Sequence, residues 1–137
     1  MGWQKERRQI ISIRRMQMTR SAVREKSYGS VKTFWLDRDY INRQLGTVVD
    51  SLRTDPNVVK IVLFGSFAED RAVPGSDMDI LLVLQSDSRR FIDRIQDYLD
   101  IFAELGIAAD VFPYTVDELD NPLVQTALRT GKVLFTR

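Results

Sequence analysis

Three short apolar segments, separated by stretches with helical periodicity, constrain the fold of this chain more than any other feature. Residues 58–64, 80–84 and 107–112 are largely apolar and too short to form core helices. Each therefore predicts a buried strand. A sheet built of such strands buries its faces against helices. We predict a further, edge strand at residues 133–135.

Helical spacing appears between the predicted strands. After Asp37, a favourable N-cap residue, apolar side chains recur at positions 41, 45, 48 and 52. We expect a second helix to begin at Ser86 or Ser88 and to end at Gly106. Its buried face is predicted to carry four side chains, Phe91, Ile95, Leu99 and Phe102.

The remaining segments complete a single small domain. We predict a short helix or turn at about residues 67–72, a turn at Pro74-Gly75, a short acidic helix capped by Thr115, and a last helix over residues 122–130. The chain of 137 residues is long enough for one hydrophobic core. The predicted fold class is α/β (α+β), with a small mixed sheet of three to four strands flanked by helices.

Composition excludes several kinds of chemistry. The chain contains no histidine and no cysteine. It therefore has no Ser-His-Asp triad, no disulfide and no zinc site of the usual kind. No apolar run approaches the ~20 residues that cross a bilayer, and the N-terminus lacks the features of a secretory signal. We expect a cytoplasmic protein without membrane contact.

Charge is divided unevenly along the sequence. Residues 1–36 hold nine Lys and Arg residues against two acids, and residues 37–137 hold eleven against seventeen. A basic N-terminal arm, 1–36, is thus predicted to precede the folded domain, 37–137. Residues 5–26 are compatible with a basic amphipathic helix, and residues 31–36 with a short strand or an extended lead-in. The arm is interpreted as partly disordered or partner-dependent, as nucleic-acid-binding, or as packed on the domain or on a second subunit.

A glycine-serine pair stands where the first predicted strand ends. Gly65-Ser66 joins that strand to the following helix or turn. Such a junction directs backbone N–H groups and the positive end of a helix dipole at one point, which suits a phosphate group. A plain turn is the alternative, because junctions of this kind are common.

Acidic residues accompany the next two strands. Asp77 and Asp79 are two residues apart, so on a strand they share one face. Two adjacent carboxylates repel each other, and a hard cation such as Mg²⁺ removes the conflict. If the first two strands are antiparallel and the third is parallel to the second, Asp110 reaches the same edge as this pair and as Gly65-Ser66. The alternatives are a turn position for Asp77 and solvent-facing positions for Asp79 and Asp110.

Gly-Ser, ten residues, Asp-x-Asp and a third Asp on a later strand form a specific combination. In this pattern, residues 37–137 resemble the polymerase-β-type nucleotidyltransferase superfamily, in particular the minimal nucleotidyltransferases, many of which are antitoxins paired with HEPN-domain toxins. Pro74-Gly75-Ser76 is also typical. Glu69-Asp70 departs from the pattern, because members often have a small or basic residue and then glycine there.

The resemblance implies a nucleotidyltransferase fold and transfer of a nucleoside monophosphate, AMP from ATP being our expectation among the triphosphates, to an acceptor hydroxyl. It implies one or two Mg²⁺ ions held by catalytic carboxylates, Asp77, Asp79 and Asp110. It implies a nucleotide-binding set, Gly65, Ser66 and Ser76. Asp110 is also the implied general base. A HEPN-type protein partner and a homo-oligomer are further expectations.

Three other function classes are considered: a phosphatase, a binding module, and a nucleic-acid-binding protein led by the basic arm. Haloacid-dehalogenase-type phosphatases also use Asp-x-Asp, but there the pair follows an apolar strand, whereas here residues 80–84 come after it. A binding module that keeps the fold without turnover, such as an antitoxin acting by contact, is the main alternative to an active enzyme.

Overall fold

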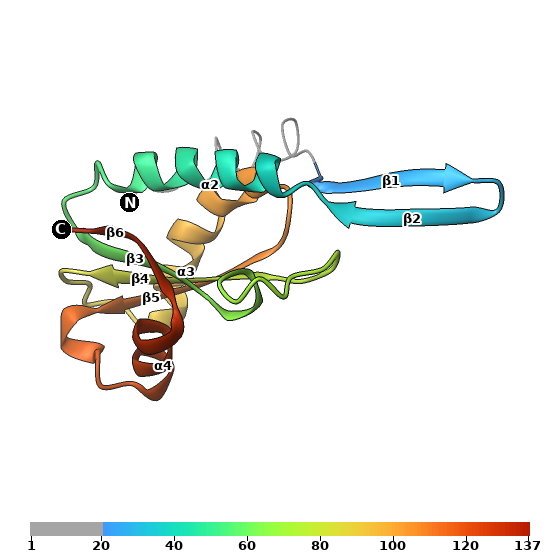
Figure 1. The fold of residues 1–137 in the computed structure, drawn as a ribbon. Coiled ribbons are helices and arrows are strands. Elements are labelled where there is room, and N and C mark those ends of the chain that lie inside the picture. The colour runs from blue at the N-terminus through green and yellow to red at the C-terminus, as the bar shows by residue number, and fades with distance from the viewer. Residues whose placement is uncertain (1–20) are drawn as a thin grey trace.

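The structure, a computed structural model, describes residues 21–137 as a hairpin followed by an α/β domain (Figure 1). The domain contains a four-stranded sheet in the order β5-β4-β3-β6. Its strands are β3 (Val58–Phe64), β4 (Met78–Leu84), β5 (Ala109–Thr115) and β6 (Lys132–Thr136). β4 is antiparallel to β3 and parallel to β5, and β6 is an antiparallel edge strand beside β3. The predicted mixed sheet is therefore confirmed.

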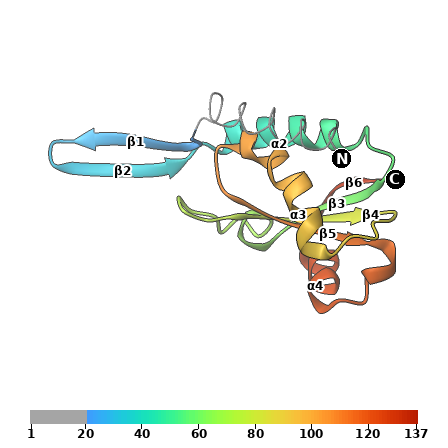
Figure 2. The same cartoon turned by 180° about the vertical axis from the view of Figure 1, so that it is seen from behind.

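Helices cover both faces of this sheet. α2 (Arg38–Leu52) lies over one face with α3 (Phe91–Leu99) and the 3₁₀ helix η2 (Ile101–Leu105), whereas α4 (Pro122–Thr130) lies on the other (Figures 1 and 2). Strand residues alternate between the two faces. Ile80, Leu82 and Leu84 join the α2 side, and Leu81 and Val83 join the α4 side. This double coverage explains why the strands are apolar along their length.

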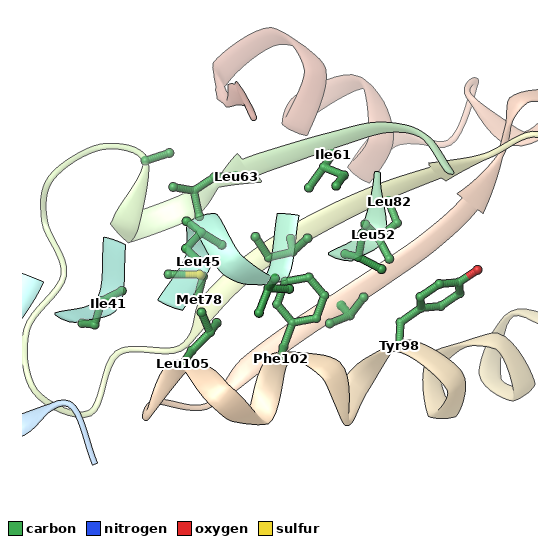
Figure 3. Close-up of a cluster of buried hydrophobic side chains, with 14 of the residues drawn as sticks. Ile41, Leu45, Leu52, Ile61, Leu63, Met78, Leu82, Tyr98, Phe102 and Leu105 are labelled. Atoms are coloured by element: carbon green, nitrogen blue, oxygen red, sulfur yellow. The ribbon is translucent and has the colours of Figure 1, made fainter. Parts of the chain in front are cut away.

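The larger core lies between α2, the sheet and η2. Ile41, Leu45 and Leu52 of α2 face strand residues and Phe102 in this core (Figure 3). Asp37 caps α2 as predicted, because its side chain accepts a hydrogen bond from the Tyr40 N–H at 3.0 Å.

The second predicted helix differs from its expected form. α3 begins after Arg90, which makes no side-chain cap, so neither Ser86 nor Ser88 is the N-cap. Its buried residues are Arg94 and Tyr98, while the predicted side chains of the helix itself are only partly buried, and Phe102 is buried from η2. Burial of Arg94 was not predicted. The helix pattern gave no sign of it, because the acidic partners of Arg94 are not on the same helix. Gly106 ends the segment with φ 77°, as predicted.

Most other boundaries agree with the predictions. β3 and α4 have the predicted ranges, β4 begins two residues early at Met78, and β5 is shifted to Ala109–Thr115. The helix or turn expected at 67–72 begins earlier, as the 3₁₀ helix η1 (Gly65–Phe67), and continues as a turn. Thr115 caps the short acidic 3₁₀ helix η3 (Val116–Glu118) in a capping box with Glu118.

The described part of the arm is a β-hairpin. β1 (Val23–Tyr28) and β2 (Val31–Leu36) pair antiparallel through the two-residue loop Gly29-Ser30 and project away from the domain (Figure 1). Gly29 has φ 64°, as the first central position of a type II′ turn requires. The helix considered for residues 5–26 is therefore wrong from Ser21 onward: residues 21–22 are not helical, and from Val23 the chain forms a strand. Residues 1–20 lie outside the described part, and the boundary at residue 37 stays a prediction.

Among the described residues, no helix combines the length and the apolar character needed to span a bilayer.

Candidate functional site

Asp79 and Asp110 lie side by side at the edge of the sheet where β4 and β5 begin. Because these strands are parallel, the register pairs Asp79 directly with Asp110. On its other side, Asp79 pairs with Phe64, the last residue of β3. Paired residues share a face, so both carboxylates stand on the α4 side of the sheet, near the ring contact between Phe64 and Phe112. The predicted strand directions, and the meeting of these two acids, are thus found in the structure.

The Gly65-Ser66 junction lies against Asp79. Gly65 has φ 74°, and a Cβ atom at this position would stand 2.3 Å from an Asp79 carboxylate oxygen. Only glycine fits there without displacing the carboxylate. The Gly65 carbonyl accepts hydrogen bonds from the N–H groups of Ala68 and Glu69, both at 3.1 Å, which closes the turn after β3. The glycine junction and the carboxylates therefore occupy the same edge of the sheet.

Asp77 adds a third negative charge to this edge. It is exposed in the loop just before β4, and Asp110 is exposed as well, whereas Asp79 is half-buried. Burial raises the pKa of the Asp79 carboxyl, and the charges of Asp110 and then Asp77 raise it further. Among the described residues, no hydrogen bond or ion pair compensates these three side chains. The three acids repel one another, and the described chain supplies no counter-charge.

This donor set fits a hard divalent cation. Uncompensated carboxylates, one of them next to a glycine that keeps space open, are the ligands that Mg²⁺ takes up together with substrate phosphates. Within residues 21–137, however, no group of three or more acidic side chains is already arranged as a complete metal site. The carboxylates share an edge without forming a closed cage, which suits an ion whose remaining ligands come from a bound nucleotide.

Ser76, which the sequence predicts to bind the nucleotide, has a structural task in the turn before β4. Its hydroxyl accepts a hydrogen bond from the Val73 N–H at 3.0 Å, and its own N–H donates to the Val73 carbonyl at 2.9 Å. These bonds close the turn at Pro74-Gly75, directly before Asp77 and the start of β4. The hydroxyl hydrogen of Ser76 remains available to a ligand.

The two unexpected acids after the junction are paired with arginines. Glu69 forms an ion pair with Arg71, and Asp70 forms one with Arg38 at 3.3 Å. Arg38 also donates a hydrogen bond to the Ala72 carbonyl at 2.9 Å, which ties the start of α2 to this turn. Their charges are thus partly offset near the junction. Sequence reasoning missed Arg38 because it lies 34 positions from Ala72 and no local pattern signals the contact.

Residues 47–137 match the family model described as "Polymerase beta, Nucleotidyltransferase". The match covers most of the chain and includes every residue of the candidate site. The chain belongs to this nucleotidyltransferase family.

One curated relative comes from Methanocaldococcus jannaschii and is named as a candidate protein adenylyltransferase. It is 32% identical over 89 residues, which are 59% of this chain and 60% of the relative. The nucleotidyltransferase chain thus aligns with somewhat over half of that protein's length.

Solved structures share the fold. A candidate nucleotidyltransferase from Sulfolobus solfataricus is 19% identical, with 73% of this chain and 86% of that chain covered and a TM-score of 0.51. A toxin–antitoxin structure with AMP-PNP is 23% identical, with 67% of this chain and 73% of that chain covered and a TM-score of 0.54. At these identities the likeness establishes the nucleotidyltransferase fold alone.

Proposed function

We propose that this nucleotidyltransferase moves a nucleoside monophosphate, AMP from ATP, to a hydroxyl group of a partner protein in a Mg²⁺-dependent reaction. The observation that carries the proposal is the register of β3, β4 and β5, which places Phe64, Asp79 and Asp110 next to one another. Asp79 stands between the Gly65 junction and Asp110, with no compensating cation among the described residues. A phosphate-binding corner and a pair of metal-binding carboxylates are thereby within reach of one ligand.

Each group has a role that its position suits. Gly65 and Ser66 contact the β- and γ-phosphates through backbone N–H groups and the Ser66 hydroxyl. Ser76 contacts the nucleotide through its remaining hydroxyl hydrogen. Asp77 and Asp79 hold the metal that accompanies the triphosphate, and Asp110 completes the carboxylate set. Bound Mg²⁺ supplies positive charge that stabilises the phosphoryl oxygens as the reaction proceeds.

The chemistry is a single in-line displacement. The acceptor oxygen forms a bond to the α-phosphorus, the bond between that phosphorus and the bridging oxygen breaks, and pyrophosphate leaves. Asp110 takes the proton of the attacking hydroxyl, since its exposed carboxylate has no competing partner among the described residues.

A protein acceptor is favoured by the relatives. The Methanocaldococcus jannaschii relative is named for protein adenylyl transfer, and two structural neighbours are toxin–antitoxin structures, one of them with AMP-PNP and the other of an MntA–HpeT variant. We extend this partnership to the present chain and propose a toxin of the HEPN type as its acceptor.

The test is transfer of label from ATP. The purified chain is incubated with Mg²⁺, a cell extract and ATP labelled at the α-phosphate, and labelled products are separated after protease or nuclease treatment. We expect a labelled protein that requires Mg²⁺ and the purified chain, and no increase over the extract alone when ATP is labelled at the γ-phosphate. Asp77→Ala and Asp79→Asn are expected to reduce labelling by more than about 100-fold, beyond the loss typical of outer-shell changes at metal sites.

Asp117→Asn is the matched control. Asp117 is an exposed aspartate in η3, beyond the opposite end of β5, and its substitution is expected to leave labelling unchanged. Labelling that persists in Asp77→Ala would refute the assignment of the site. Label found only on nuclease-sensitive material would refute the protein acceptor.

The second candidate is an antitoxin-like contact module without turnover. It is favoured by the incomplete arrangement of the carboxylates within the described residues. Calorimetric titration with ATP and Mg²⁺ separates the two candidates. A working site binds the nucleotide only with metal and loses binding when Asp77 and Asp79 are both changed to Asn, whereas a contact module gives no metal-dependent heat.

A further inference from the structure

The β1–β2 hairpin has two unlike faces, and neither is used by the proposed transfer reaction. In an antiparallel pair, residues opposite each other share a face. The register places five exposed residues together on one face, here called the outer stripe: Lys26, Tyr28, Val31, Thr33 and Trp35. The opposite face carries Phe34 with Glu25 and Lys32, which form an ion pair at 3.4 Å.

The outer stripe combines a cation with aromatic rings and contains no acid. Trp35 is 44% exposed and Tyr28 59% exposed, although large aromatic side chains are usually well buried. The Lys26 ammonium lies 5.1 Å from the centre of the Tyr28 ring. Two exposed rings beside a positive charge, on a flat ribbon, form a surface on which flat aromatic ligands with negative charge can stack.

The base of the hairpin is held in place. The Arg24 guanidinium forms an ion pair with Asp37 at 2.9 Å, donates to the Ser21 carbonyl at 2.6 Å and lies over the Tyr40 ring. Ala22 and Leu36 are buried in the domain core. The ribbon is therefore presented from a fixed base, and exposure of the outer stripe follows from this placement.

Charge identifies the kind of ligand. Residues 1–36 carry nine Lys and Arg residues against two acids, and residues 37–137 carry eleven against seventeen. Six of those nine precede residue 21, and in the hairpin Lys26 is the cation of the outer stripe. A polyanion is thus attracted to the arm and repelled by the domain. An acidic protein surface would satisfy the charge but offers few planar groups to stack on the two exposed rings, whereas every unpaired base has a flat face.

We propose that the outer stripe binds single-stranded nucleic acid, with bases stacked on Trp35 and Tyr28 and a phosphate group paired with Lys26. Stacking on exposed rings is available to any unpaired base, so binding depends little on sequence. Duplexes bind less well, because their bases are already stacked on each other. This binding is separate from nucleotidyl transfer and needs neither ATP nor Mg²⁺.

The experiment measures fluorescence anisotropy of end-labelled oligo(U) and oligo(dT) with the full chain, in the absence of ATP and Mg²⁺. We expect both oligonucleotides to bind, and a duplex of the same length to compete poorly. Trp35→Ala is expected to weaken binding by about 5- to 150-fold, the range for loss of one stacked base. Lys26→Ala is expected to reduce the slope of log affinity against log salt by about 0.7.

Phe34→Ala is the matched control, because Phe34 is also an exposed aromatic residue of β2 (52% exposed) but lies on the opposite face. It is expected to leave affinity unchanged. Equal losses of affinity in Phe34→Ala and Trp35→Ala would overturn the proposal. An affinity that neither substitution changes would also overturn it, and would favour a protein partner for the outer stripe. Circular dichroism of each variant verifies that it folds.

Discussion

The two ends of the β4–β5 strand pair differ in whether their acidic residues have basic partners. Where the strands begin, Asp79 and Asp110 stand side by side without a compensating cation among the described residues. Where they end, Arg94 reaches Glu118 at 2.6 Å and Arg89 reaches Asp87 at 2.7 Å. The same sheet thus keeps one group of carboxylates paired and another unpaired.

This difference indicates that the paired end stabilises the fold and that the unpaired end is available to bind a ligand. Arg94 is 5% exposed, yet four of its five N–H groups donate hydrogen bonds: besides Glu118, they reach the carbonyls of Arg89, Pro113 and Asp87. Such a network holds α3 and η3 on the ends of the strands. The carboxylates at the other end contribute no such bonds, and their repulsion opposes folding. An arrangement that costs stability at one edge of a sheet is characteristic of a site whose compensation comes from a ligand.

The largest expected effect is at the paired end. Arg94→Ala is expected to lower the free energy of unfolding by about 3 kcal/mol, because it leaves the Glu118 carboxylate and three carbonyls without their donor. Urea denaturation measures the change. Arg90→Ala is the control, since Arg90 is on the same helix end but its ion pair with Asp93 is exposed, worth at most about 1 kcal/mol. Similar losses in both variants would contradict the comparison.

At the unpaired end, Gly65→Ala is expected to lower the free energy of unfolding by about 1–2 kcal/mol, because alanine is strained at φ 74°. The added Cβ also displaces the Asp79 carboxylate. The free energy of Mg²⁺-dependent ATP binding should therefore decrease by more than the free energy of unfolding does. Gly46→Ala, within α2 and with open space around its Cβ, is the control and is expected to be neutral or stabilising. Calorimetry that finds unchanged ATP binding in Gly65→Ala would separate the glycine junction from the nucleotide site.

The sequence predicted the unpaired end better than the paired one. Gly65, Asp77 and Asp79 belong to one short local pattern, and strand direction alone brings Asp110 to them. Arg94 escaped prediction because a helical pattern treats arginine as exposed, whereas its partner Glu118 is 24 residues away. The strand at residues 31–36 was one of the two forms expected there, but its partner β1 was missed, because residues 5–26 were interpreted as a basic amphipathic helix. A short local motif could therefore be predicted from the sequence, whereas an ion pair between residues far apart in the sequence could not.

Removing one charge from the unpaired end should stabilise the protein. Asp79→Asn, measured with a chelator present, is expected to raise the melting temperature by about 4 °C, since about 1 kcal/mol gives a shift between those of 100-residue and 150-residue domains at this size. The reason is relief of burial and of repulsion by Asp110 and Asp77, which together raise the pKa of the Asp79 carboxyl. Adding Mg²⁺ should then raise the melting temperature of the unchanged protein and not that of the variant. If the variant melts at a lower temperature than the unchanged protein in the presence of chelator, the Asp79 carboxylate stabilises the fold and the prediction is contradicted.

The smallest expected effect is a pH dependence at the paired end. The hydrogen bond from Arg94, aided by those from the Thr115 N–H and hydroxyl, holds the pKa of the Glu118 carboxyl below its ordinary value. A lowered pKa means that the folded state binds this proton less tightly than the unfolded state. The stabilisation is therefore complete above the ordinary pKa of glutamate, about 4.3, and is lost as the pH falls through the lower folded value. Glu118→Gln should cost up to about 1 kcal/mol at pH 7 and progressively less in acid, as urea denaturation at a series of pH values would measure. Asp117→Asn, next to it and exposed, should leave the pH profile unchanged. A constant cost of Glu118→Gln at every pH would mean that shape, and not the charge facing Arg94, is what this carboxylate contributes.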